Sequence, residues 1–157
     1  MPSYADDRAA IENLMARYLF ALDFFDADAY AECFTEDGVL DWAMGQIHGR
    51  EAIRAEAARM KASMAKVFGD GTILRHFATN IAIRVEDDRA WTRAAWFEAY
   101  NNGPAGGPAM GTFGHYEDEL VRVDGRWLFR FRKIFNEFLD GRKADTDNPV
   151  AQMEKLP

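Results

Sequence analysis

The segment Tyr116–Phe129, YEDELVRVDGRWLF, contains the pattern that decides the fold. Aromatic and β-branched residues lie on both sides of the pair Asp124-Gly125, and this pair tolerates the positive φ angles of a tight β-turn. The segment therefore predicts a β-hairpin whose strands cover residues 111–123 and 127–138.

The two segments upstream of this hairpin have the same composition and predict two more long strands. Residues 72–85 and 90–101 are rich in aromatic and β-branched residues, and the polar turn VEDDRA separates them. Four consecutive long strands joined by turns predict a β-meander.

The first seventy or so residues have a different periodicity, which indicates helices. Ile11, Leu14 and Tyr18 have the spacing of one helical face, so a helix is predicted over residues 5–22. A short helix over residues 28–34, a short strand over 39–42 and a third helix over 51–68 are expected to follow.

Helices followed by a run of strands indicate the α+β class, with three N-terminal helices packed on a strongly curved, mostly antiparallel sheet. A twisted sheet covered on one side by helices forms a cone around a hydrophobic cavity that suits a small ligand. We predict one domain over residues 1–139 and a polar, loosely held C-terminal tail over residues 140–157.

Composition excludes several classes of protein. The formal charge of -7 and the absence of a basic run argue against nucleic acid as a partner, because phosphate binding needs clustered Lys and Arg. No stretch approaches about 18 apolar residues, so no membrane partner is expected. The sequence shows no signal peptide, and the lone Cys33 cannot form an intrachain disulfide, so a cytoplasmic location is expected.

His76 and Asp23 are the residues whose placement most needs a chemical explanation. Alternation along residues 72–85 puts His76 on one face with Ala78, and puts Phe77 and Ile83 on the opposite face, which is expected to be the core. Asp23 ends the first helix, where the helix dipole disfavours an acid, so its carboxylate needs a partner. An imidazole beneath it would supply one, and Asp23 would in turn orient and activate His76 as a base. The alternative is a structural hydrogen bond that joins the helix to the sheet.

Tyr18 lies on the same helix as Asp23 and has two interpretations. Its hydroxyl could donate to a substrate oxygen at the mouth of the cone. The alternative, a core tyrosine on the apolar stripe of the helix, is favoured by the sequence alone.

Several motifs, in order and with matching spacing, resemble the nuclear transport factor 2-like, SnoaL-like superfamily. The resemblance covers about residues 5–138 and rests on LMARYLFALD, ECFTEDGVLDW, HGREAI, RHFATN and YEDELVRVDGRWLF. Tyr18, Asp23 and His76 match the Tyr, Asp and His of bile acid 7α-dehydratase. Asp23 and His76 also match the Asp–His pairs of scytalone dehydratase and hexachlorocyclohexane dehydrochlorinase.

The resemblance implies a lyase that needs neither a metal nor an organic cofactor. In such enzymes the His removes a proton, the Asp orients it and a β leaving group departs. The implied substrate is a small hydrophobic alicyclic, steroid-like or aromatic molecule, and the implied assembly is a homo-oligomer, a dimer or a trimer. Residues expected to contact the substrate are Phe24 at the mouth and Trp42, Tyr100 and Tyr116 in the pocket. An isomerase or cyclase that uses the same proton abstraction, and a ligand-binding module without activity, stay open as alternatives.

The remaining polar residues give weaker signals. The three histidines are dispersed and have no metal-ligand spacing, so no metal site is predicted. Arg130, Arg132 and Lys133 alternate with Phe129 and Phe131 on the last strand. One of these cations could reach the cavity and hold an anionic group, but a solvated face is the favoured interpretation.

Overall fold

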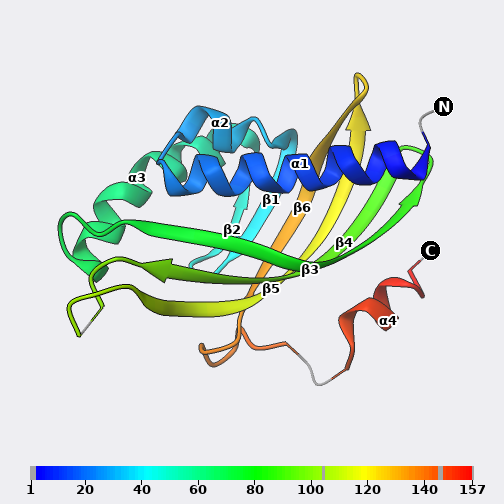
Figure 1. Ribbon diagram of the computed structural model, residues 1–157. Helices are drawn as coiled ribbons and strands as arrows, with labels where there is room; N and C mark the ends of the chain where they lie inside the picture. The colour runs from blue at the N-terminus through cyan, green and yellow to red at the C-terminus, as the bar shows by residue number, and fades with distance from the viewer. Residues whose placement is uncertain (1–2, 104, 145–146, 157) are drawn as a thin grey trace.

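The computed structural model describes residues 3–103, 105–144 and 147–156. The elements are α1 Tyr4–Asp23, α2 Ala27–Ala31, β1 Phe34–Trp42, β2 Gly45–His48, α3 Arg50–Phe68, β3 Leu74–Glu86, β4 Arg89–Tyr100, β5 Ala109–Val123, β6 Arg126–Asn136 and α4 Pro149–Met153. Helices α1, α2 and α3 lie over one face of the sheet, and α4 lies under the opposite face (Figure 1).

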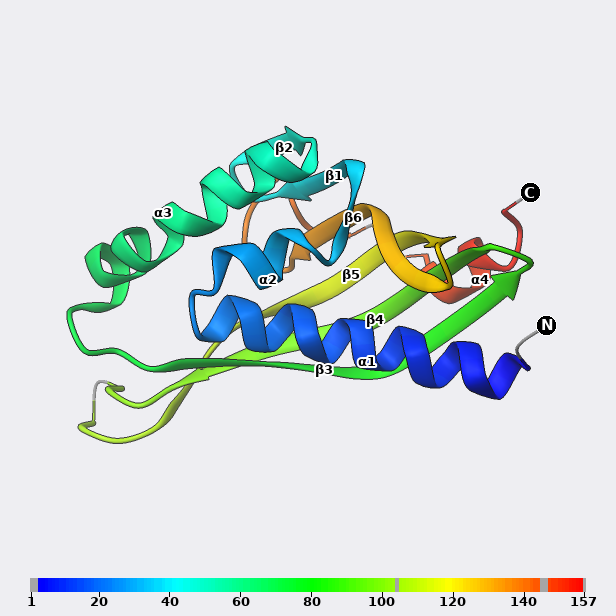
Figure 2. The ribbon, with the colours of Figure 1, turned by 90° about the horizontal axis from the view of Figure 1, so that it is seen from above.

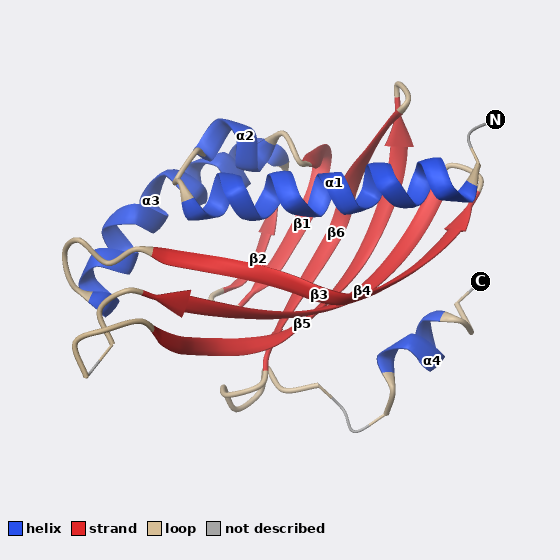
Figure 3. Ribbon diagram, viewed as in Figure 1, coloured by secondary structure: helices blue, strands red, loops and turns tan. Residues whose placement is uncertain are grey.

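The six strands form one curved sheet in the order β2-β1-β6-β5-β4-β3. Only the β1–β6 pair is parallel, and every other neighbouring pair is antiparallel. Figure 3 shows the four long strands side by side beneath α1. The expected α+β class, with three N-terminal helices on a mostly antiparallel sheet, is confirmed.

The first helix begins and ends where local chemistry sets its limits. Ser3 caps α1, and the side chain of Asp6 accepts from the Ser3 backbone N–H, so two otherwise unpaired donors are satisfied. The helix ends at Asp23, and Phe25 just beyond it has a φ of 56°. The apolar stripe that contains Ile11, Leu14 and Tyr18 is buried, as the spacing predicts.

The segment between α1 and α3 differs from the sequence-based expectation. The second helix is shorter, Ala27–Ala31, and the strand after it begins at Phe34 and runs through the polar letters TEDG. The strand was expected to begin only at residue 39, but Phe34 already pairs with Phe129 of β6. The letters TEDG lie within the shift of register between Phe34 and Val39, where β1 pairs with β6 on either side of them. Strand β2, Gly45–His48, has no counterpart among the expected elements.

A β-bulge in β3 reverses the faces expected for this strand. The pairing with β4 shifts between Thr79 and Ala82, and Asn80 has a φ of 53°. Phe77, which was expected to face the core, is 46% exposed, whereas Ile83 beyond the bulge is buried. Side chains before and after the bulge therefore follow opposite alternation, and His76 lies on the face that points toward α1.

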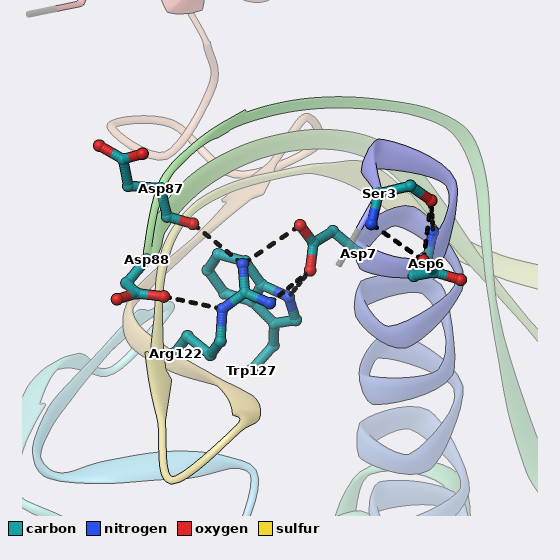
Figure 4. A network of polar contacts seen from close by, with 7 residues as sticks. All are labelled: Ser3, Asp6, Asp7, Asp87, Asp88, Arg122 and Trp127. Atoms are coloured by element: carbon teal, nitrogen blue, oxygen red, sulfur yellow. Dashed lines mark hydrogen bonds and ion pairs between the residues drawn. The ribbon is translucent and has the colours of Figure 1, made fainter. Parts of the chain in front are cut away.

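The N-terminal end of α1 is tied to two turns of the sheet by a buried carboxylate (Figure 4). Asp7 accepts from Arg122 Nη1 at 2.7 Å and from Trp127 Nε1 at 3.0 Å. Arg122 also donates to the Asp88 carboxylate at 2.9 Å and to the Asp87 carbonyl at 3.0 Å. The network fixes the end of α1 that lies far from Asp23.

The described part of the predicted tail, residues 140–144 and 147–156, includes the short helix α4, whose Met153 is 3% exposed. The guanidinium of Arg84 on β3 donates to the carbonyls of Met153 at 2.9 Å and Leu156 at 2.7 Å. The segment thus packs on the face of the sheet opposite α1 (Figure 1).

Candidate functional site

Asp23 at the end of α1 and His76 on β3 lie in direct contact. Figure 2 shows how α1 lies along β3. His76 Nδ1 is 2.6 Å from Asp23 Oδ1, and the backbone N–H of His76 donates to Asp23 Oδ2 at 3.0 Å. The side chains are 11% and 5% exposed. The acid at the helix end is thus compensated by two donors from the sheet, as its unfavourable position in the helix requires.

A third residue, Glu98, completes the contacts of the imidazole. His76 Nε2 is 3.1 Å from Glu98 Oε2, and the two residues are direct cross-strand partners on β3 and β4. Glu98 Oε1 accepts from the backbone N–H of Thr112 at 3.1 Å and from its hydroxyl at 2.7 Å. Gly111 leaves room for this carboxylate, because a Cβ at that position would lie 2.7 Å from Glu98 Oε1. His76 is therefore held between two buried carboxylates.

Sequence reasoning did not identify Glu98. The available signal was a single acid inside the apolar strand segment WFEAY, on the same face as Trp96 and Tyr100. What makes Glu98 part of the site is its register opposite His76, which the sequence pattern does not specify.

The electrostatics of this group favour a protonated imidazole. Burial would lower the pKa of His76, but the hydrogen bonds and charges of Asp23 and Glu98 outweigh it and raise the pKa from 6.5 to about 9. For Glu98, burial raises the pKa, and the stronger combined effect of the His76 and Thr112 hydrogen bonds lowers it. At neutral pH, His76 is an imidazolium whose two N–H groups each donate to a carboxylate.

An aromatic layer continues from His76 into the core. The Trp96 ring lies 6.3 Å from the imidazole and stacks on Tyr116 with ring centres 6.0 Å apart. Tyr116 in turn meets Tyr18 edge-on at 6.4 Å. The Tyr18 hydroxyl is 2.7 Å from that of Tyr30, and all three tyrosines are buried, which raises their pKa values. Tyr18 thus occupies a core position, and its hydroxyl is bonded within that core.

Arg132 lies inside this layer, and the favoured expectation of a solvated face is wrong for it. Its side chain is 1% exposed and forms a bidentate ion pair with Asp118. Nε donates to Oδ1 at 2.8 Å, and Nη2 donates to Oδ2 at 2.9 Å. The guanidinium carbon lies 4.1 Å from the ring centres of Tyr18 and Tyr116 and 4.0 Å from that of Phe129. The ion pair and the three rings, which come from α1, β5 and β6, pack together in the core.

The other residues expected to contact a substrate are spread over the structure. Phe24 is 61% exposed at the end of α1, and the Arg75 guanidinium lies 4.5 Å from its ring centre. Tyr100 ends β4 on the strand that carries Glu98. Trp42 packs on the edge of the core at the end of β1, and three strands lie between β1 and β3. Tyr116 joins the aromatic layer next to His76.

An apolar gap separates the end of α1 from α3, and it is too small for a ligand. It is lined by Ala21, Leu22, Phe25, Asp26, Tyr30, Ala57 and Met60. The gap has no room for a water molecule.

Two further properties of residues 3–103, 105–144 and 147–156 bear on the kind of site. Within these ranges, no three His, Cys, Asp or Glu side chains are grouped so that they could hold a metal ion. Nor does this part of the chain contain a helix with the length and apolar character needed to cross a membrane.

The chain belongs to the SnoaL-like domain family, whose model matches residues 3–133. This family includes polyketide cyclases and dehydratases, and its fold is the cystatin-like α+β fold. The uncharacterized protein Rv2910c of Mycobacterium tuberculosis is 27% identical over 122 residues, which are 77% of this chain and 79% of that protein.

Two solved structures show the same fold over most of their length. Rv3472(D26N) of Mycobacterium tuberculosis, described as a protein of unknown function, has a TM-score of 0.72 and 29% identity, covering 94% of this chain and 89% of its own. A candidate scytalone dehydratase of Novosphingobium aromaticivorans has a TM-score of 0.68 and 23% identity, covering 90% of this chain and 94% of its own.

Proposed function

We propose that this protein is a cofactor-independent lyase that eliminates water from a small hydrophobic alicyclic, steroid-like or aromatic substrate. The observation that carries the proposal is the buried group Asp23–His76–Glu98, in which an imidazole lies between two carboxylates. Such an arrangement holds a proton at a defined atom in a water-poor site, which is what acid–base catalysis requires. Membership of a family that includes dehydratases supports it.

The contact with Glu98 leads us to propose a paired acid and base in place of His76 acting alone. The substrate carries a hydroxyl β to a carbonyl. Glu98 Oε2 takes the proton from the carbon next to the carbonyl, His76 Nε2–H gives its proton to the hydroxyl, and water leaves as the double bond forms. The proton on Glu98 then returns to His76 across the 3.1 Å contact. The pair begins and ends with one shared proton, and Asp23 fixes the ring through Nδ1.

Tyr18 stays a prediction of the resemblance and has no part in this step. Its hydroxyl is bonded to Tyr30 in the core. An isomerase that starts with the same proton abstraction would use Glu98 and His76 alike, but would return the proton to a different carbon of the substrate.

A second candidate function is binding of a small hydrophobic ligand without turnover. The SnoaL-like fold would serve it even if the Asp23–His76–Glu98 group were only a structural link between α1 and the sheet. The two functions differ in whether product forms, so one experiment separates them.

The experiment follows two signals for a panel of hydrophobic β-hydroxy ketones incubated with the protein in D₂O. Loss of water from each compound reports elimination, and deuterium entry next to the carbonyl reports proton abstraction. We expect His76→Gln to lower the rate by about 10²- to 10⁴-fold, because it removes the acid. Asp23→Asn should lower it less, because the ring keeps its contact with Glu98.

His115→Gln is the matched control. His115 also lies between two carboxylates, with Nδ1 3.0 Å from Glu137 and Nε2 3.3 Å from Glu117, but it does so on the outer face of the sheet. The His115→Gln variant should lose water from the substrate at the wild-type rate. Equal rates in wild type and His76→Gln would refute the lyase, and saturable binding of panel members with neither signal would establish the binding function instead.

Self-association as a dimer or trimer is a further proposal that rests on the resemblance. Sedimentation velocity over a hundredfold range of concentration tests it. A single monomeric species at every concentration would contradict it.

A further inference from the structure

A second pocket lies on the outer face of the sheet, away from His76. Its volume is about 260 Å³, and it is lined by Asp41, Lys133, Phe135, Gly141, Arg142 and Lys143. Leu40 and Arg132 on the same strands are buried in the core, so alternation places Asp41 and Lys133 on the opposite face. The pocket therefore belongs to β1, β6 and the chain that follows β6, whereas His76 belongs to β3.

The one carboxylate that lines the pocket already has its partners. Asp41 Oδ1 accepts from Arg142 Nη1 at 2.6 Å, and Asp41 Oδ2 accepts from Gln46 Nε2 at 3.1 Å. Arg142 Nη2 donates to the backbone carbonyls of Asp41 at 3.1 Å and Ile134 at 2.6 Å. Arg142 thus neutralises Asp41 and fixes the wall of the pocket against β1 and β6.

The carboxylate next to the pocket is likewise paired. Glu117 is the cross-strand neighbour of Lys133, but its oxygens lie 3.1 Å from Arg93 Nη2 and 3.3 Å from His115 Nε2. The charge of Lys133 also acts on Glu117 and on Asp41, but each of these carboxylates is already paired with an arginine, Arg93 and Arg142.

Two ammonium groups are left to set the charge of the pocket. Lys133 Nζ lies 4.4 Å from the ring centre of Phe135, a contact that holds the cation without neutralising it. Lys143 Nζ lies 2.8 Å from Asp140, but these side chains are 52% and 99% exposed, and such surface pairs are weak and easily exchanged. A concave cationic site stands out in a chain whose formal charge is -7.

We propose that this pocket binds a small oxyanion, a phosphate or carboxylate group, between the ammonium groups of Lys133 and Lys143. A volume of about 260 Å³ accommodates such a group with several waters, since each water takes about 30 Å³ of liquid volume. The bound group joins the segment Gly141–Lys143 to β6.

The test is a titration of the full chain with sodium phosphate and, in parallel, sodium acetate, with sodium chloride holding the ionic strength constant. Amide chemical shifts of Gly141, Arg142 and Lys143 are the readout. We expect saturable shifts with phosphate or acetate, and the tighter of the two identifies the preferred group. Lys133→Met and Lys143→Met should each weaken binding at least about tenfold, which corresponds to about 1.4 kcal/mol.

Lys61→Met, which removes an exposed ammonium from α3, is the matched control and should bind as wild type does. Shifts that do not saturate, or affinities that are equal in wild type, Lys133→Met and Lys143→Met, would overturn the proposal. Neither result depends on the activity proposed for His76.

Discussion

Replacement of Glu98 by Gln provides the sharpest test of the electrostatics around His76. The side chain keeps its shape and an oxygen for His76 Nε2–H, but it loses the charge. Opposite unit charges about 4 Å apart interact by about 4 kcal/mol at an effective dielectric constant of 20, and one pKa unit corresponds to about 1.36 kcal/mol. Loss of the Glu98 charge can therefore lower the pKa of His76 by at most about three units. The Asp23 contact remains, so we expect the pKa of His76 to fall from about 9 by roughly one to two units.

The same change alters how stability depends on pH. The pKa of His76 in the folded protein is raised to about 9 from its ordinary value of 6.5, so the protonated ring stabilises the fold. This contribution is fully present below pH 6.5 and is lost as the pH rises through 9. In the wild type it is on the order of 3 kcal/mol. Glu98→Gln should therefore flatten the decline of unfolding free energy between pH 6.5 and 9.

The assay is a pH titration of the histidine ring signals by NMR, together with denaturant unfolding at several pH values. Glu117→Gln is the matched control, because it removes a carboxylate from His115 on the outer face and should leave the pKa of His76 unchanged. A wild-type pKa of His76 near 6.5, or the same pKa in wild type and Glu98→Gln, would refute the reasoning.

Three further substitutions probe the parts that hold the site together. Gly111→Ala places a Cβ against Glu98 and should lower the pKa of His76 in the same NMR titration, with the fold retained by circular dichroism. Asp7→Ala removes the buried partner of Arg122 and should lower the unfolding free energy by about 3–5 kcal/mol, measured by denaturant titration; a loss under 1 kcal/mol would contradict a role in fixing α1. Tyr18→Phe breaks a buried hydrogen bond and should cost about 1–3 kcal/mol in the same measurement, whereas unchanged stability would argue against its core role.

The periodic parts of the fold could be predicted from the sequence because they depend on local spacing. The apolar stripe of α1 and the long strands of the meander were located to within a few residues. The strand that begins at Phe34 was not, because its start depends on the pairing of Phe34 with Phe129, 90 or so residues away in sequence. The packing of the residues around Met153 against the sheet likewise depends on a distant residue, because Arg84 of β3 donates to the Met153 carbonyl.

The candidate site likewise has features that the sequence could predict and features that depend on tertiary contacts. The sequence by itself determined that Asp23 at the end of a helix needs a donor and that His76 belongs to a strand able to supply it. Only the tertiary structure decided that Glu98 is its second partner and that Arg132 is buried. Strand register and the bulge near Asn80 set which side chains face one another, and both depend on pairing between distant segments. A local pattern shows which groups need a partner, and the packed sheet determines which partner each one has.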